Sequence, residues 1–252
     1  IGSVIPGNVI EIRVDPHLAS KAAAGATRVR VRDGTSFSRF DIEQLLQHEV
    51  FVHSLTALNG RAQRKLASLS LGAPRTTATQ EGLATFAELV SGAIEIRRLE
   101  RIALRIIGID AALSGADFIE VFELFREAGQ PDVESFNSTM RIFRGVPVDG
   151  GSAFTKDAVY LQGLLEVHTF FRWALRSGRL ELGRHLLAGR MSLADVFALE
   201  PFFVAGELAG PQHLPPWMSR TNALTAHLAF SVFANHIVLD DVVPEAFARA
   251  GN

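Results

Sequence analysis

The sequence predicts an α+β fold that is mainly α-helical, with a small β-sheet near the N-terminus. Two short segments, residues 9–14 and 27–32, alternate apolar and polar residues with the period of two that is typical of strands. After the Asp-Gly turn at residues 33–34, nearly every segment has the capping residues and apolar spacing of helices. No internal repeat or long linker divides the 252 residues, so we expect one domain, residues 1–252. Because Ile1 is preceded by no initiator Met, we expect this domain to be a fragment of a longer chain.

The first predicted helix begins after Ser38. Its hydroxyl and the Asp41 carboxylate have the spacing of a capping box, which satisfies N–H groups of the first helical turn. The stretch FDIEQLLQHEVFVHSLTAL continues the helix to Asn59-Gly60, a pair that is typical of helix ends.

Seven further helices are predicted along the rest of the chain. Thr77 and Gln80 have the spacing of a second capping box, which should open a long helix that runs through Glu81 to Arg105. Residues 146–157 (VPVDGGSAFTKD) are expected to form a Gly-rich loop between helices. The other predicted helices cover residues 116–128, 131–143, 157–176, 180–187, 192–199 and 221–239.

The composition argues against several classes of protein. The 25 basic and 27 acidic residues are scattered, whereas a nucleic-acid binder would show a basic stripe. No apolar run reaches the roughly 18–20 residues of a membrane-spanning helix. The absence of cysteine excludes disulfides and thiolate ligands, so His and carboxylate groups would have to hold any metal. We therefore expect a cytoplasmic protein with no nucleic-acid partner and no membrane span, and the oligomeric state stays open.

The segment HEVFVH, residues 48–53, places two histidines five positions apart on the first helix. Each residue of an ideal α-helix turns by about 100°, so the two imidazoles would point roughly 140° apart. One extra residue in a π-type turn would realign them, and such turns are frequent at functional sites. The segment alone leaves two alternatives, a distorted metal-binding helix or a hydrogen-bonded polar cluster in the core.

The segment TQEGLATFAE, residues 79–88, supplies a third candidate ligand. Glu81 is expected in the first turn of its helix, where the helix dipole favours an ionised carboxylate. Two imidazoles and one carboxylate form the ligand set of many catalytic zinc sites, which leave a fourth position to water. Glu49, next to His48, would be free to accept a proton from that water. Glu88 could hydrogen-bond a ligand imidazole, although we favour an exposed, salt-bridging side chain there.

Together, the two motifs resemble those of the QEGLA-motif family of bacterial proteins, which is related to the microtubule-associated tyrosine carboxypeptidases of animals. The Asn-Gly pair at 59–60 and the segment FRG…FTKDAVYLQG, residues 143–163, extend this resemblance. It runs from about Arg30 to about His168, which is more than half of the chain. The pair of motifs is specific, whereas HExxxH by itself would be weak.

The resemblance implies a zinc-metallopeptidase-like helical domain in which His48, His53 and Glu81 bind Zn²⁺ and Glu49 activates the water at the zinc. The function we expect is that of a carboxypeptidase that removes the C-terminal residue from a peptide or protein tail. Two alternatives stay open. The chain could be a non-catalytic, metal-containing regulatory or peptide-binding protein, or it could hydrolyse a small amide with the same residues.

Four further residues are candidates for contact with the substrate. Tyr160, the one tyrosine of the chain, could donate a hydrogen bond to an oxyanion or to the substrate, or could be a half-buried structural residue. A free terminal carboxylate is best held by a bidentate arginine, and Arg141 and Arg144 precede the Gly-rich loop. Lys156 is the next candidate, although each cation alone could be an ordinary surface charge. Four histidines without a partner at ligand spacing are expected to be structural: His168, His185, His227 and His236.

Overall fold

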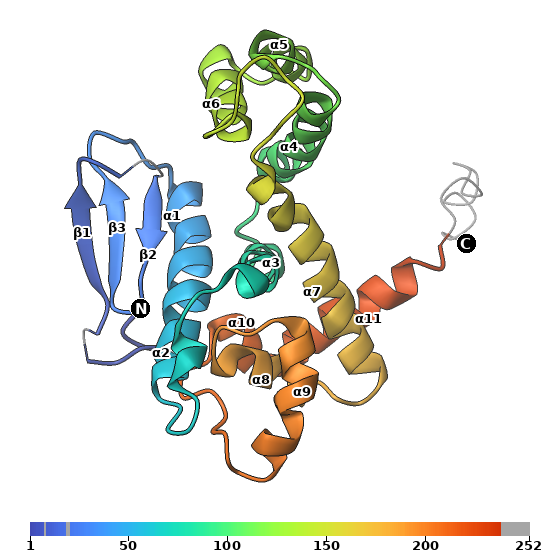
Figure 1. The fold of residues 1–252 in the computed structure, drawn as a ribbon. Helices are drawn as coiled ribbons and strands as arrows, with labels where there is room; N and C mark the ends of the chain where they lie inside the picture. The colour runs from blue at the N-terminus through green and yellow to red at the C-terminus, as the bar shows by residue number, and fades with distance from the viewer. Residues whose placement is uncertain (8, 19–20, 238–252) are drawn as a thin grey trace, which may run out of the picture.

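The fold consists of packed helices with a three-stranded sheet on one side (Figure 1). This computed structural model describes residues 1–7, 9–18 and 21–237. Helices make up 61% of the structure, and the small sheet lies near the N-terminus. The predicted fold class is therefore confirmed.

The sheet contains the strands β1 (Glu11–Asp15), β2 (Ala22–Ala24) and β3 (Arg28–Arg32) in the order β1-β3-β2. β1 pairs with β3 in parallel, and β2 pairs with β3 in antiparallel fashion. The two predicted strands correspond to β1 and β3. β2 was not predicted, because three alanines in a row show no alternation of apolar and polar residues.

The first predicted helix exists, but it is built from three segments in direct succession. These are α1 (Arg39–Leu45), the π-helix η1 (Leu46–Ser54) and α2 (Leu55–Arg61). The predicted capping box is confirmed, since the Ser38 hydroxyl accepts a hydrogen bond from the Asp41 N–H and the Asp41 carboxylate accepts one from the Ser38 N–H.

The helix predicted to end at Asn59-Gly60 ends one residue later, at Arg61. Both residues of the pair serve packing. A Cβ on Gly60 would lie 2.3 Å from the carbonyl oxygen of Leu69, so only glycine fits there. The buried Asn59 side chain donates to the carbonyls of Leu187 and His213 and thereby ties the helix to the second half of the chain.

The single long helix predicted from residue 77 onward is two helices, α3 (Pro74–Val90) and α4 (Ile96–Leu113). α3 begins three residues earlier than predicted, with proline at its first position, where a missing N–H costs nothing. The Thr76 hydroxyl, rather than that of Thr77, accepts the N–H of the residue before the helix. Gly92 (φ 72°) lies in the turn between the two helices, in the left-handed region that favours glycine.

The second half of the chain follows the predicted succession of helices, with shifts at their ends. The last predicted helix was to reach residue 239, but residues 238–252 lie outside the described part of the structure. Within the described ranges, no helix is long and apolar enough to cross a membrane. The elements are η2 (Ala67–Ser70), α5 (Phe118–Glu127), α6 (Asp132–Ile142), η3 (Thr155–Ala158), α7 (Val159–Arg176), α8 (Glu181–His185), η4 (Leu186–Ala188), α9 (Leu193–Val204), α10 (Pro216–Ser219) and α11 (Thr221–Ala234).

The helices α3 and α7 cross at very short distance near the centre of the molecule (Figure 1). A Cβ on Gly82 of α3 would lie 2.2 Å from the carbonyl carbon of Gly163 of α7. A Cβ on Gly163 would in turn lie 2.1 Å from the carbonyl oxygen of Ala78. The glycine of QEGLA and the glycine of YLQG are therefore the two halves of one backbone contact.

The apolar residues form two main clusters. The larger one joins η1, α3 and α7 with the C-terminal helices and contains the fully buried Leu55, Phe86 and Phe171. The second holds together α4, α5 and α6, with Phe125 and Ile142 at 0% exposure. Figure 1 shows these three helices gathered at one end of the molecule, next to the start of α7.

Candidate metal centre

The π-helix η1 turns two histidines toward each other. Its nine residues, LQHEVFVHS, include both His48 and His53. In the wider turn of a π-helix, positions five apart fall on nearly the same face. The two ring centroids are 4.8 Å apart. The local distortion predicted from the five-residue spacing is thus confirmed.

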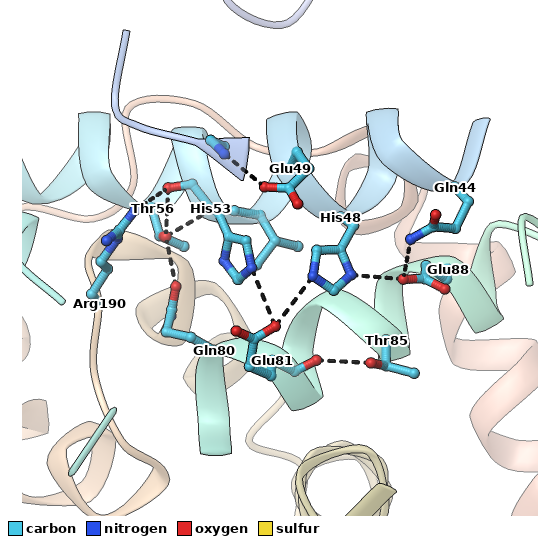
Figure 2. Close-up of polar contacts among 12 residues, drawn as sticks. Gln44, His48, Glu49, His53, Thr56, Gln80, Glu81, Thr85, Glu88 and Arg190 are labelled. Carbon is cyan, nitrogen blue, oxygen red and sulfur yellow. Dashed lines mark hydrogen bonds and ion pairs between the residues drawn. The ribbon is translucent and has the colours of Figure 1, made fainter. Parts of the chain in front are cut away.

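Glu81 of α3 points at both imidazoles (Figure 2). Its Oε2 lies 3.2 Å from Nε2 of His48 and 3.6 Å from Nε2 of His53. One ligand atom from each residue lies within 4.8 Å of the other two, so this group could hold a metal ion. It is the one such group of three found among the described residues. The structure thus brings the three predicted ligands together.

The charge of Glu81 is stabilised by the histidines and not by the start of its helix. α3 begins at Pro74, which places Glu81 about two turns inside the helix. The helix dipole acts mainly within the first turn, so the predicted dipole stabilisation is wrong. Burial raises the pKa of Glu81, but hydrogen bonds with His48 and His53 outweigh burial and lower this pKa far below its usual range.

Glu88 lies behind His48 and orients it. Its Oε1 is 2.7 Å from Nδ1 of His48 and accepts a hydrogen bond of 2.8 Å from the Gln44 side chain (Figure 2). Nη2 of Arg98 donates to the same oxygen at 2.8 Å, and the Arg98 Nε donates to Oε2. The Glu88 side chain is 0% exposed, so the expectation of an exposed residue is wrong. A carboxylate on the far nitrogen of a ligand histidine fixes the ring and raises its basicity.

The protonation of His48 follows from these two carboxylates. Burial lowers the pKa of His48, but hydrogen bonds to Glu81 and Glu88 outweigh it and raise this pKa to about 9. Burial raises the pKa of Glu88, yet His48 and Arg98 lower it overall. With Nδ1 facing Glu88, the ring presents Nε2 toward Glu81 and His53. This is the nitrogen that a metal would need.

Glu49 follows His48 in the chain and is held by the sheet. Its Oε2 accepts a hydrogen bond of 2.9 Å from the N–H of Ala24, at the edge of β2 that does not pair with β3 (Figure 2). The side chain is half-buried. A carboxylate in this position is next to a candidate ligand imidazole without being part of the three-residue group.

Tyr160 lies near the start of α7 and beside the histidines. Its ring centroid is 6.4 Å from that of His48. Burial raises the pKa of Tyr160 to about 12, and Glu81 adds to this shift. The close contact of Gly82 with Gly163 brings these two helices together. The Tyr160 hydroxyl therefore keeps its proton and can donate a hydrogen bond.

The three predicted cations for substrate contact differ in their surroundings. Arg141 is held by Asp157, to which Nε donates at 2.6 Å and Nη2 at 2.8 Å. Arg144 is exposed and lies over the ring of Phe154, 5.5 Å from its centroid. Lys156 is also exposed and forms no ion pair with the described residues. Of the three cations, only Arg141 is thus partly buried and held in place by a carboxylate.

Three arginines at the site were not predicted. Arg98 and Arg105 lie seven residues apart on α4, a spacing that puts both on one helix face and could have indicated a shared role. Arg190 donates to the carbonyl oxygen of His53 at 3.1 Å (Figure 2). This residue precedes a predicted helix in sequence, and no local pattern connects it with the histidines.

The remaining histidines of the prediction have aromatic neighbours. His168 lies 6.0 Å from Phe86 and 6.4 Å from His227, measured between ring centroids. His185 stacks on Phe203 at 4.3 Å. These contacts agree with structural roles for His168, His185 and His227, and that of His236 stays a prediction.

Comparison with known proteins gives one finding. A family model described as microtubule-associated tyrosine carboxypeptidase matches residues 1–236. No curated protein matches the chain. The matched range includes the whole candidate metal centre together with Tyr160 and Arg190.

Proposed function

The chain belongs to the microtubule-associated tyrosine carboxypeptidase family, and from this membership we propose that it is a zinc-dependent carboxypeptidase. Its proposed substrate is the C-terminal tail of a peptide or protein, from which it removes the last residue. The observation that carries the proposal is the convergence of His48, His53 and Glu81 on one point. The π-helix between α1 and α2 is needed for this convergence.

The donor atoms suit zinc. Tetrahedral zinc binds imidazole nitrogen and carboxylate oxygen at about 2.0–2.2 Å, which separates neighbouring donors by roughly 3.3–3.5 Å. The distances of 3.2 and 3.6 Å from the Glu81 carboxylate to the two imidazoles bracket this value. The chain has no cysteine, and a set of two histidines and one glutamate is typical of catalytic zinc. When bound, zinc would acidify water and polarise a carbonyl oxygen.

In this proposal Glu49 is the general base. Its position next to His48 brings a carboxylate close to the three ligands without making it one of them. Its bond to the Ala24 N–H fixes one oxygen, so the other can accept the proton of the attacking water. The same carboxylic acid can then protonate the leaving amine, which completes the proton transfer.

Tyr160 is the proposed donor to the developing oxyanion. Its pKa of about 12 keeps the hydroxyl protonated at neutral pH, which this role requires. Arg141, Arg144 and Lys156 are the proposed contacts for the substrate tail. Arg141 is positioned by Asp157, whereas the exposed Arg144 and Lys156 could follow a flexible tail.

The test of this function combines metal analysis with cleavage of a peptide library. We expect one zinc per chain, and cleavage of single C-terminal residues that a chelator stops. The Glu49→Gln variant should keep the zinc and lose turnover by about 100-fold to 10,000-fold, which is the range of general-base catalysis. A chain that cannot be loaded with zinc, or a Glu49→Gln variant that cleaves as well as the unaltered protein, would contradict the proposal.

A further inference from the structure

Beside the candidate metal centre lies a group of charged side chains, which we call the arginine cluster. It contains three guanidinium groups but only two carboxylates, and three of its members, Arg105, Arg141 and Asp157, act on the pKa of Tyr160. Its members come from α3, α4, α6 and η3, so no single segment of the chain forms it. The cluster consists of Arg98, Arg105, Arg141, Glu88 and Asp157.

Two of the three arginines each hold one carboxylate through two hydrogen bonds. Nε and Nη2 of Arg98 both donate to Glu88, and the corresponding nitrogens of Arg141 both donate to Asp157. Arg105 differs from them. It shares Asp157 at 3.3 Å through Nη1, and its buried Nε has no hydrogen-bond partner among the described residues.

An anion bound next to Arg105 would compensate its positive charge. Burial and the positive charge of Arg141 lower the pKa of Arg105 to about 10, so its charge is poorly compensated there. A guanidinium has five N–H donors, and leaving a buried one unpaired is costly. The Arg105 and Arg141 side chains keep 16% and 29% exposure, so a small anionic group can reach them.

We infer that Arg105, held beside Arg141 by their shared Asp157, binds the free C-terminal carboxylate of the substrate. This inference rests on the proposed function and names the group that such an enzyme recognises. One residue of extended chain spans roughly 3.3–3.6 Å, so the terminal carboxylate lies close to the peptide bond that is cut. The receptor must therefore adjoin the metal centre.

Tyr160 provides the spatial link between the two parts of the site. Its ring lies 6.4 Å from that of His48, and its hydroxyl is close enough to Glu81, Arg105 and Arg141 that all three shift its pKa. Tyr160 would thus lie between two groups of the substrate. These are the carbonyl that is cleaved, near the histidines, and the terminal carboxylate, near Arg105. The exposed Arg144 and Lys156 are too strongly solvated for this task and would contact the preceding part of the tail.

The experiment measures binding and does not depend on turnover. A zinc-loaded Glu49→Gln protein is mixed with a pool of acetylated tripeptides that end in a free carboxylate, and with the same pool as C-terminal amides. We expect the acids to bind roughly 10- to 100-fold more tightly, the effect of hydrogen bonds to a charged group. Adding Arg105→Gln should reduce this preference to below about threefold, since the guanidinium that binds the carboxylate is lost.

Arg101→Gln, on the same helix α4, is the matched control. Arg101 pairs with Glu134 at 2.7 Å outside the cluster, so this variant should keep the full preference for acids. The comparison of acids with amides on the Glu49→Gln protein needs no further mutation and holds even if Arg105→Gln does not fold. Equal binding of the two pools, or no binding of either, would overturn the inference. An intact preference for acids in folded Arg105→Gln would do the same.

Failure of the proposed function gives a different result. If the chain does not cleave peptides but Arg105 still selects acids over amides, the carboxylate site stands and the carboxypeptidase does not. If cleavage is found but Arg105→Gln leaves the preference for acids unchanged, the carboxypeptidase stands and Arg105 is not the carboxylate site. Both outcomes are read from the same set of proteins.

Discussion

The two parts of the candidate site differ in the charge that they can accept. Around the histidines, the carboxylate of Glu81 lies against both imidazoles, and this negative group suits a cation. In the arginine cluster the surplus is positive, which suits an anion. A site that cleaves beside a free carboxylate needs both environments next to each other. Tyr160 links them in this structure, since its ring lies 6.4 Å from that of His48 and the charges of Arg105 and Arg141 act on its pKa.

The largest expected effect concerns the metal-binding part. If three ligands share roughly 12 kcal/mol of binding free energy, then His48→Ala should weaken zinc binding about a thousandfold. Competition with a chromophoric chelator measures this loss. His17→Ala removes an exposed histidine and should leave zinc affinity unchanged. Full zinc occupancy of His48→Ala at micromolar zinc would refute the ligand assignment.

The second-largest effect is expected at the crossing of α3 and α7, where a substitution should lower the free energy of unfolding. The Cβ of Gly163→Ala would lie 2.1 Å from the Ala78 carbonyl oxygen, so α7 and α3 must separate. Urea denaturation should show a loss of about 3 kcal/mol in the free energy of unfolding, as for severe overpacking. In the control Gly25→Ala, the nearest atom lies 3.6 Å away, and stability should hardly change. An unaltered unfolding midpoint for Gly163→Ala would show that the close crossing is not formed.

The next effect tests whether the arginine cluster stabilises the fold independently of the metal centre. Asp157→Asn leaves Arg105 and Arg141 without their shared carboxylate and should lower the free energy of unfolding by about 2 kcal/mol, below the full value for a buried pair because both arginines are partly exposed. Zinc content should be unchanged. Asp132→Asn is the control, since its 78% exposed side chain should contribute almost nothing. Loss of zinc in Asp157→Asn would mean that the two parts are one unit.

The smallest expected effect comes from the residue behind the ligand. Glu88→Gln should keep the shape of the hydrogen bond to His48 but lose its charge, and zinc affinity should fall about tenfold, the lower end for such outer contacts. Chelator competition again provides the measurement, with the exposed Glu43→Gln as control. If both variants bind zinc as tightly as the unaltered chain, Glu88 serves stability alone.

Much of the fold followed from local patterns. The capping box of Ser38, the strands β1 and β3 and most helices of the second half were predicted, because caps and periodicity act over a few residues. The three candidate ligands were predicted for the same reason. They lie in two short motifs, and with a five-residue spacing His48 and His53 could share an ion only through a π-type turn, which the structure contains.

Tertiary packing decided the remaining features. Three features depend on contacts between residues far apart in sequence: the sheet edge that holds Glu49, the burial of Glu88 and the unpaired Nε of Arg105. Gly60 marked a helix end in the sequence, but its packing contact was not predicted. Local patterns were enough to predict which side chains could meet on one helix face, since helical geometry is local. Only the folded chain decided which charges are buried together, because desolvation and pairing depend on every element that surrounds them.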